Sequence, residues 1–230
     1  MLSEVIAFEA CAELANEVLA KQGIADRYTG PSLLHEFVGQ NFRGMLTSVM
    51  KKYGFALPPA ELDEYVDREL GQVTKALEQR AEPCEGAVEV VQRLQAGGQY
   101  ELAVVSSSAL SRVQASIRKV GLAGAFPPDR VFSAASSLPT PTSKPDPAVY
   151  NFACAQIGAQ QAHCVAVEDS KSGATAAKNA GIPLIGYVGP YETEEERAHM
   201  AQVLREECGA LVIMRHWSEF WDALKTVEAA

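Results

Sequence analysis

A serine cluster at the end of an apolar run could bind a phosphate group. Ser106, Ser107 and Ser108 follow the run LAVV (102–105) directly and precede a predicted helix. Hydroxyls and free backbone N–H groups at the start of a helix bind anions, and phosphate in particular. Serine is also a good helix cap, so this segment alone leaves both interpretations open.

A lysine in a proline-rich loop could supply a cation to the same phosphate. Lys144 lies in LPTPTSKPDPAVY (138–150), immediately before Pro145 and ahead of a helix that Asp146 can cap. Proline restricts the backbone beside the lysine, so the ammonium group can be directed at an anion. A single loop lysine is usually solvated, so its significance depends on the groups that accompany it.

Two adjacent carboxylates end a later apolar run and could bind a metal ion. Glu168 and Asp169 lie in VAVEDSKSG (165–173), where Ser170 and Gly173 open the next helix. Neighbouring carboxylates at the end of a buried strand repel each other unless a cation compensates. Mg²⁺ typically binds one or two carboxylates together with water and substrate phosphate. The alternative is that Asp169 caps the helix while Glu168 points to solvent.

The elements that must position these groups alternate between strand and helix from about residue 83. Predicted strands cover 102–105, 131–134, 164–167, 183–188 and 211–214, and predicted helices cover 86–96, 109–120, 146–158, 171–180, 193–207 and the C-terminal segment. This alternation predicts an α/β fold with a parallel sheet covered by helices on both faces. Ligands bind beyond the carboxyl ends of such strands, where serines, lysine and acids form a set suited to phosphoryl transfer.

The first 80 residues lack strand patterns and are predicted to be helical. Apolar residues at helical spacing indicate a helix from about residue 5 to the stop at Gly23, followed by helices at 31–38, 42–53 and 59–80. A small helical domain therefore precedes or interrupts the α/β domain.

Charge and cysteine content exclude several classes of function. The net charge is −9, and no basic run could follow a nucleic-acid backbone. The acidic N-terminal region does not resemble a secretory signal, and the apolar run 210–214 is too short to cross a membrane. The five cysteines show no C-x-x-C spacing, which argues against a zinc site or disulfide framework. We expect a cytoplasmic protein that binds neither nucleic acid nor membranes.

The ordered motifs resemble those of the haloacid dehalogenase superfamily, in its branch of capped β-phosphoglucomutase-like and phosphoglycolate-phosphatase-like enzymes. Ser106 matches the second motif, Lys144 in SKPDPAVY the third, and Glu168 with Asp169 in VAVEDSKSGATAAKNAG the fourth. The resemblance implies a Rossmann-like core formed by 1–11 and 81–230. It also implies a helical cap at 12–80.

The resemblance further implies roles for these residues. Ser106 and Lys144 would be catalytic, and Ser106, Ser107 and Lys144 would bind the phosphate. Asp169, supported by Glu168, would hold the cofactor Mg²⁺.

One expected motif is not found in the sequence. The resemblance implies an aspartate nucleophile in a D-x-D-G segment, on a strand between the serine-bearing and acid-bearing strands. No D-x-D occurs here, and Ser3 resembles a residue that follows that motif. Glu9 in FEAC (8–11) could be a degenerate version, but the helical spacing of this segment argues against it. We expect the first core strand to be missing and the protein to start upstream of Met1; the alternative is an inactive remnant.

The substrate is expected to be a small phosphorylated metabolite, such as a sugar or polyol phosphate. The segment EFVGQNFRGML (36–46) resembles the cap segment that contacts the substrate in sugar-phosphate members of the family. Arg43 is the main candidate for such a contact, with Asn41 a weaker one, although Arg43 lies one residue farther from Gly39 than that pattern has it. The leading function is a phosphatase; a phosphosugar mutase and an inactive phosphate-ester-binding protein are the alternatives. The oligomeric state is not predicted.

Overall fold

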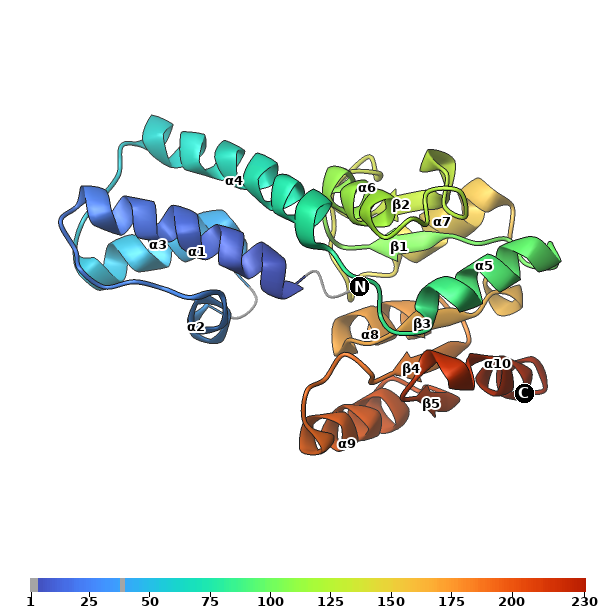
Figure 1. Ribbon diagram of the computed structural model, residues 1–230. Coiled ribbons are helices and arrows are strands. Elements are labelled where there is room, and N and C mark those ends of the chain that lie inside the picture. The colour runs from blue at the N-terminus through green and yellow to red at the C-terminus, as the bar shows by residue number, and fades with distance from the viewer. Residues whose placement is uncertain (1–3, 38–39) are drawn as a thin grey trace. The chain divides into compact units, whose positions relative to one another are not determined.

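A computed structural model describes residues 4–37 and 40–230 (Figure 1). The chain divides into two compact units, 1–82 and 83–230, which we call the helical unit and the sheet unit. The expectations for Ser3 and Gly39 lie outside the described residues.

The helical unit is built from four helices within its described residues. These are α1 (Glu4–Lys21), α2 (Gly30–Glu36), α3 (Phe42–Tyr53) and α4 (Pro59–Arg80). Buried apolar side chains from these helices, among them Leu19, Leu33 and Val73, form the interior of the unit. The helical character expected of this region is confirmed.

The first helix bears on two expectations from the sequence. Residues 8–11 lie inside α1, so FEAC is helical here and not a strand. Glu9 on this segment accepts a hydrogen bond from Arg80 at 2.6 Å. The helix continues unbroken to Lys21, and for that reason residues 4–11 belong to the helical unit, whereas the resemblance implies a core that includes residues 1–11.

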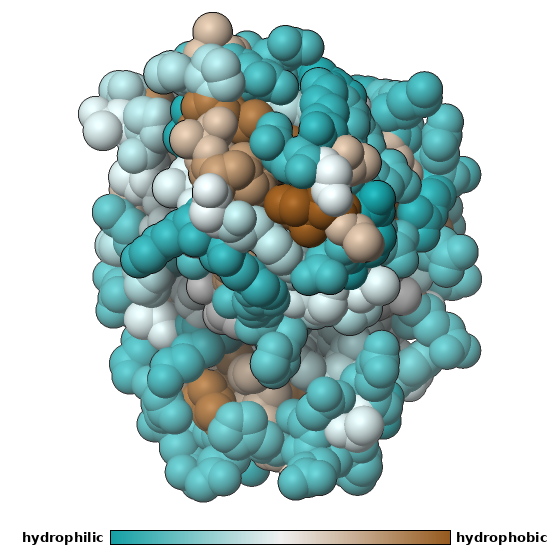
Figure 2. All heavy atoms as spheres, turned by 90° about the vertical axis from the view of Figure 1, so that its left-hand side faces the viewer, coloured by the Kyte–Doolittle hydropathy of each residue, from teal (hydrophilic) through white to brown (hydrophobic). Residues whose placement is uncertain are grey.

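Ion pairs occupy the surface of the helical unit. Glu17 of α1 accepts hydrogen bonds from Arg68 and Tyr65 of α4, and these lower the pKa of Glu17 to about 2. The face of the molecule drawn in Figure 2 is mostly hydrophilic, with smaller hydrophobic areas. Exposed pairs of this kind contribute little to stability, so the apolar interior holds the unit together.

The sheet unit alternates helices and strands as the sequence predicts. Its main elements are α5 (Ala87–Gly97), β1 (Val104–Ser106), α6 (Leu110–Lys119), β2 (Val131–Ser133), α7 (Ala148–Ile157), β3 (Ala166–Glu168), α8 (Lys171–Asn179), β4 (Leu184–Tyr187), α9 (Glu194–Gln202), β5 (Val212–Met214) and α10 (Phe220–Glu228). The helix expected at 193–207 is divided into α9 and a π-helical turn at 203–207. The predicted α/β fold with parallel strands is confirmed.

The strands form two separate parallel sheets. β1 pairs with β2, and β4 pairs with both β3 and β5. Among the described residues, no strand pairs with both β1 and β3. The sheet is therefore divided between the strand that carries the serines and the strand that carries the acids, which is where the resemblance implies a further strand.

One helix covers both sheets on one side. Val88 of α5 and Val104 of β1 pack against the same apolar cluster. Leu94 of α5 belongs to a second cluster, against which Val167 of β3 packs. The apolar side chains of α5 therefore hold the two sheets under one helix although their strands do not pair.

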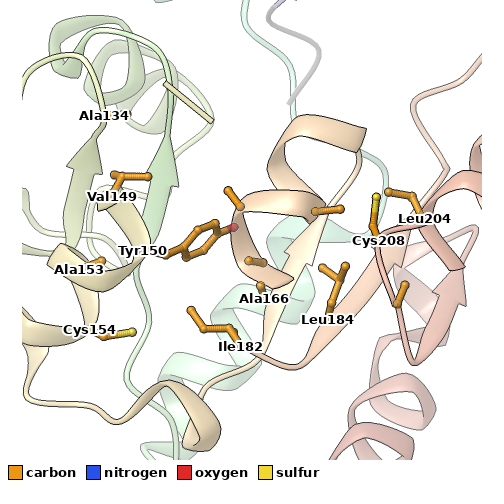
Figure 3. Close-up of a cluster of buried hydrophobic side chains, with 14 of the residues drawn as sticks. Ala134, Val149, Tyr150, Ala153, Cys154, Ala166, Ile182, Leu184, Leu204 and Cys208 are labelled. Atoms are coloured by element: carbon orange, nitrogen blue, oxygen red, sulfur yellow. The ribbon is translucent and has the colours of Figure 1, made fainter. Parts of the chain in front are cut away.

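A second helix covers both sheets on the opposite side. Tyr150 of α7 and Ala166 of β3 belong to one buried cluster, and Val105 of β1 packs against it (Figure 3). Successive side chains of a strand point to opposite faces, so Val104 and Val105 contact different helices. Apolar side chains of α5 therefore cover one face of the division between the sheets, and those of α7 cover the other face.

No helix among residues 4–37 and 40–230 combines the length and apolar character needed to span a bilayer.

The central strand of the three-stranded sheet should dominate the stability of the sheet unit. Ile185 of β4 is fully buried, and we expect Ile185→Ala to reduce the free energy of unfolding by about 2–5 kcal/mol. Leu211 is 47% exposed, so Leu211→Ala should change the free energy of unfolding by less than about 0.5 kcal/mol. Denaturant unfolding can be followed by the fluorescence of Trp217 and Trp221, both in this unit. Equal losses in the two variants would contradict the assigned core.

Candidate functional site

The serine loop after β1 is held by hydrogen bonds within the loop and to its neighbours. The backbone N–H of Ser108 donates to the Ser106 hydroxyl at 3.1 Å. The hydroxyl of Ser133, which is fully buried at the end of β2, donates to the Ser108 carbonyl at 2.7 Å. The Ser107 hydroxyl accepts the backbone N–H of Lys144 at 3.1 Å. The structure thus brings the serine loop and the lysine loop together.

Lys144 connects the two sheets. Its Nζ donates to the Val105 carbonyl of β1 at 3.0 Å and forms an ion pair with Glu168 of β3. Only 8% of the Lys144 side chain is exposed, so it does not behave as a solvated loop lysine. The cation therefore lies at the carboxyl ends of β1 and β3, where the α/β topology predicts a ligand site.

Glu168 is buried and held by two donors. Its Oε1 accepts hydrogen bonds from Lys144 Nζ and from the hydroxyl of Tyr150. Figure 3 shows the Tyr150 ring reaching from α7, and Lys144 Nζ lies 4.9 Å from the centre of that ring. Burial and the Glu168 carboxylate raise the pKa of Tyr150 well above its usual value, so the phenol stays protonated and keeps donating.

The first turn of α8 fits closely against the Glu168 carboxylate. A side-chain carbon added at Gly173 would overlap that carboxylate. The N-cap of α8 is Ser170, whose hydroxyl accepts the Gly173 N–H at 3.1 Å. The alternative in which Asp169 caps this helix and Glu168 points to solvent is therefore wrong, because Ser170 is the cap and Glu168 is buried.

Asp169 follows β3 beside this cluster and is partly exposed. Its backbone carbonyl accepts a hydrogen bond from the Tyr191 hydroxyl at 2.8 Å. Within the described part of the chain, no group of three or more His, Cys, Asp or Glu side chains is arranged to hold a metal ion. Glu168 and Asp169 are adjacent carboxylates at the end of β3.

Three further residues shape this site and are not predicted from the sequence pattern: Tyr150, Gly173 as a packing partner, and Ser133. The one signal for Tyr150 is a phenol in the largely apolar helix 148–157, whose hydroxyl needs a partner once it is buried. The contact between Gly173 and Glu168 depends on three-dimensional packing, and the spacing of residues along the sequence does not indicate it.

The candidate substrate residues belong to the helical unit, where both have structural partners. Asn41 is the N-cap of α3, and its side chain accepts the Gly44 N–H at 2.9 Å. Arg43 forms an exposed ion pair with Asp63 at 2.6 Å. A substrate contact by Arg43 or Asn41 stays a prediction.

Comparison with known proteins identifies the family. A family model described as haloacid dehalogenase-like hydrolase matches residues 7–187, well over half of the chain. The chain belongs to the haloacid dehalogenase-like hydrolase family. The family resemblance inferred from the serine, lysine and acid motifs is therefore confirmed.

The chain is similar to known proteins, among them two solved structures and one curated relative. A haloacid dehalogenase family hydrolase from Deinococcus radiodurans, with bound phosphate and sodium, is 25% identical with a TM-score of 0.65, over 96% of this chain and 90% of that one. CbbY from Rhodobacter sphaeroides, in complex with xylulose-(1,5)bisphosphate, is 20% identical with a TM-score of 0.67, over 92% and 88%.

The curated relative is a CBBY-like protein from Arabidopsis thaliana. It is 45% identical over 56 residues, which are 24% of this chain. The match therefore covers only 18% of the length of that relative.

The pair of Lys144 and Glu168 should be strongly coupled in stability. Lys144→Met leaves a buried carboxylate without its cation, so we expect a loss of about 3–5 kcal/mol in the free energy of unfolding. The double variant Lys144→Met/Glu168→Gln should recover a large part of that loss. Lys225→Met, which breaks an exposed pair with Asp222, should cost less than about 1 kcal/mol. Additive effects of the two changes at the buried pair would contradict the coupling.

Proposed function

We propose that this hydrolase removes the phosphoryl group from a small phosphorylated metabolite, most simply a sugar or polyol phosphate. The observation that carries the proposal is the meeting of the serine loop, Lys144 and Glu168 at the carboxyl ends of β1 and β3. Phosphate bound to one of its relatives, and a sugar bisphosphate bound to another, support the same class of substrate.

Some residues of the site would bind the phosphate, and others would bind a metal ion. The Ser106 and Ser107 hydroxyls and the loop N–H groups would donate to phosphate oxygens. The Lys144 ammonium, already positioned by the Val105 carbonyl, would neutralise the charge that develops on the transferred group. Because Lys144 is nearly buried, its interaction with phosphate is screened less than at an exposed site.

The carboxylates fit the proposed cofactor, Mg²⁺. Lys144 and Tyr150 engage Oε1 of Glu168, so Asp169 would be the main ligand and Glu168 would support it. Two carboxylates suit an ion that keeps several waters and also binds substrate phosphate. When bound, the ion would polarise the phosphoryl oxygens and offset their negative charge.

The phosphoryl group would be accepted by a further carboxylate. We propose that an extended segment outside the described residues supplies it, lying between β1 and β3. On β1, the Ser106 carbonyl bonds to Ala134 beside β2, so the Val105 carbonyl faces the division in the sheet. On β3, the N–H of Ala166 bonds to Pro183 beside β4, so Val167 presents its N–H to the same division.

The second candidate is a catalytically inactive protein that binds phosphate esters. The absence of any D-x-D segment in the sequence favours it. It shares the phosphate site with the first candidate and differs in never becoming phosphorylated. Mass spectrometry of the chain extended before Met1, after incubation with acetyl phosphate, distinguishes the two, because only an active enzyme gains a phosphoryl group.

Binding of phosphate tests the site itself. Titration calorimetry with inorganic phosphate and Mg²⁺ should detect binding, and Lys144→Met should weaken it about tenfold or more because a charge-assisted contact is lost. Lys225→Met, at an exposed lysine of the same unit, should leave the affinity unchanged. An affinity unaffected by Lys144→Met would rule out this site as the phosphate-binding site.

Turnover tests the proposed reaction. The chain can be extended before Met1 by an apolar segment that ends in Asp-x-Asp and assayed with sugar and polyol phosphates in Mg²⁺. We expect phosphate release from the extended chain, and none when both added aspartates are asparagines. Asp169→Asn should reduce the rate by about a hundredfold or more, since it removes the main metal ligand. Asp222→Asn, at a carboxylate side chain that is 90% exposed, should leave the rate unchanged. Turnover insensitive to Asp169→Asn would refute the proposal.

A further inference from the structure

Cys154 and Cys164 lie close together, and the proposed reaction uses neither of them. Cys154 is in the last turns of α7, and Cys164 lies two residues before β3. Their Sγ atoms are 3.9 Å apart, and both thiols are free. This pair joins the helix that carries Tyr150 to the strand that carries Glu168.

The two thiols differ in their access to solvent. Cys154 is 4% exposed within the apolar cluster shown in Figure 3, and burial together with the neighbouring thiol raises its pKa to about 11. Cys164 is partly exposed, and its Sγ donates to the Gln160 carbonyl at 3.3 Å. A water-borne reagent therefore reaches Cys164 first, while Cys154 is held next to it.

We propose that Cys154 and Cys164 are a redox-modification site, oxidised by a hydroperoxide to a disulfide that tethers α7 to β3. The arrangement of one accessible sulfur with a second buried beside it suits a two-step oxidation. It also explains how cysteines without C-x-x-C spacing can act together, since the fold, and not the sequence, pairs them.

The oxidation balances with hydrogen peroxide as the oxidant. The Cys164 thiolate attacks one peroxide oxygen, the O–O bond breaks, and the departing hydroxide takes up a proton, which leaves a sulfenic acid. The Cys154 sulfur, after losing its proton, then attacks the Cys164 sulfur, and the S–O bond breaks to release a second water. Two thiols and one peroxide give one disulfide and two waters, and two electrons pass from the sulfurs to the peroxide.

The geometry allows the second step with a small movement. Cys164 has an extended backbone outside any helix, so a change of its side-chain rotamer would bring its sulfur toward Cys154. The new link would close the loop of residues 155–163. Restricting the unfolded chain in this way stabilises the folded state.

The test uses the full wild-type chain. After treatment with hydrogen peroxide and alkylation of the remaining thiols, non-reducing peptide mapping should show a Cys154–Cys164 link and the loss of two hydrogen atoms. Dithiothreitol should restore both thiols. Cys11, Cys84 and Cys208 should stay alkylated throughout. Alkylation of Cys154 and Cys164 in the treated protein, or a link from either to another cysteine, would overturn the proposal.

A second measurement tests the tether. The oxidised chain should unfold at a higher temperature than the reduced chain, as followed by tryptophan fluorescence of the sheet unit. Cys164→Ala should abolish this shift, whereas Cys208→Ala should keep it, whatever the effect of each change on the starting stability. An unchanged unfolding temperature after the link has formed would contradict the tether.

Discussion

The candidate site depends on one buried ion pair, between Lys144 and Glu168. Burying either charge alone would be costly, because neither would keep its hydration. Together they are compensated, since Lys144 also bonds the Val105 carbonyl and Glu168 also accepts from Tyr150. The four groups come from both sheets, from the lysine loop and from α7. The pair therefore fixes the serine loop, the lysine loop and the end of β3 relative to one another, although β1 and β3 share no strand partner among the described residues.

Under the proposed function, a phosphate and a divalent cation would bind together at the Lys144–Glu168 pair. A phosphate would compete with Glu168 for Lys144, and a cation would compensate the carboxylate that Lys144 releases. Binding of one would thus favour binding of the other. In this structure the pairing of Lys144 with Glu168 avoids an isolated buried charge.

The sequence predicted most of the fold because hydrophobic periodicity reports which faces are buried. It also located Ser106, Lys144 and the acidic pair, since their order along an alternating α/β pattern determines that they meet at one edge. It could not predict that Lys144 is buried, because the local sequence does not record a partner 24 residues away. The contacts of Tyr150 and Gly173 with Glu168 are likewise tertiary, and the grouping of residues 4–11 with the helical unit follows from a helix that runs on without a break.

Residue-resolved hydrogen exchange by NMR tests whether the sheet is divided at the site, where the Lys144–Glu168 pair joins its two parts. The N–H groups of Val105 and Val167 face the division, whereas β4 is paired on both sides. In the 230-residue chain without any added segment, we predict that the amides of Val105 and Val167 exchange orders of magnitude faster than those of residues 184–187 in β4. Equal protection at these positions in that chain would show a continuous sheet and would contradict the division at the site.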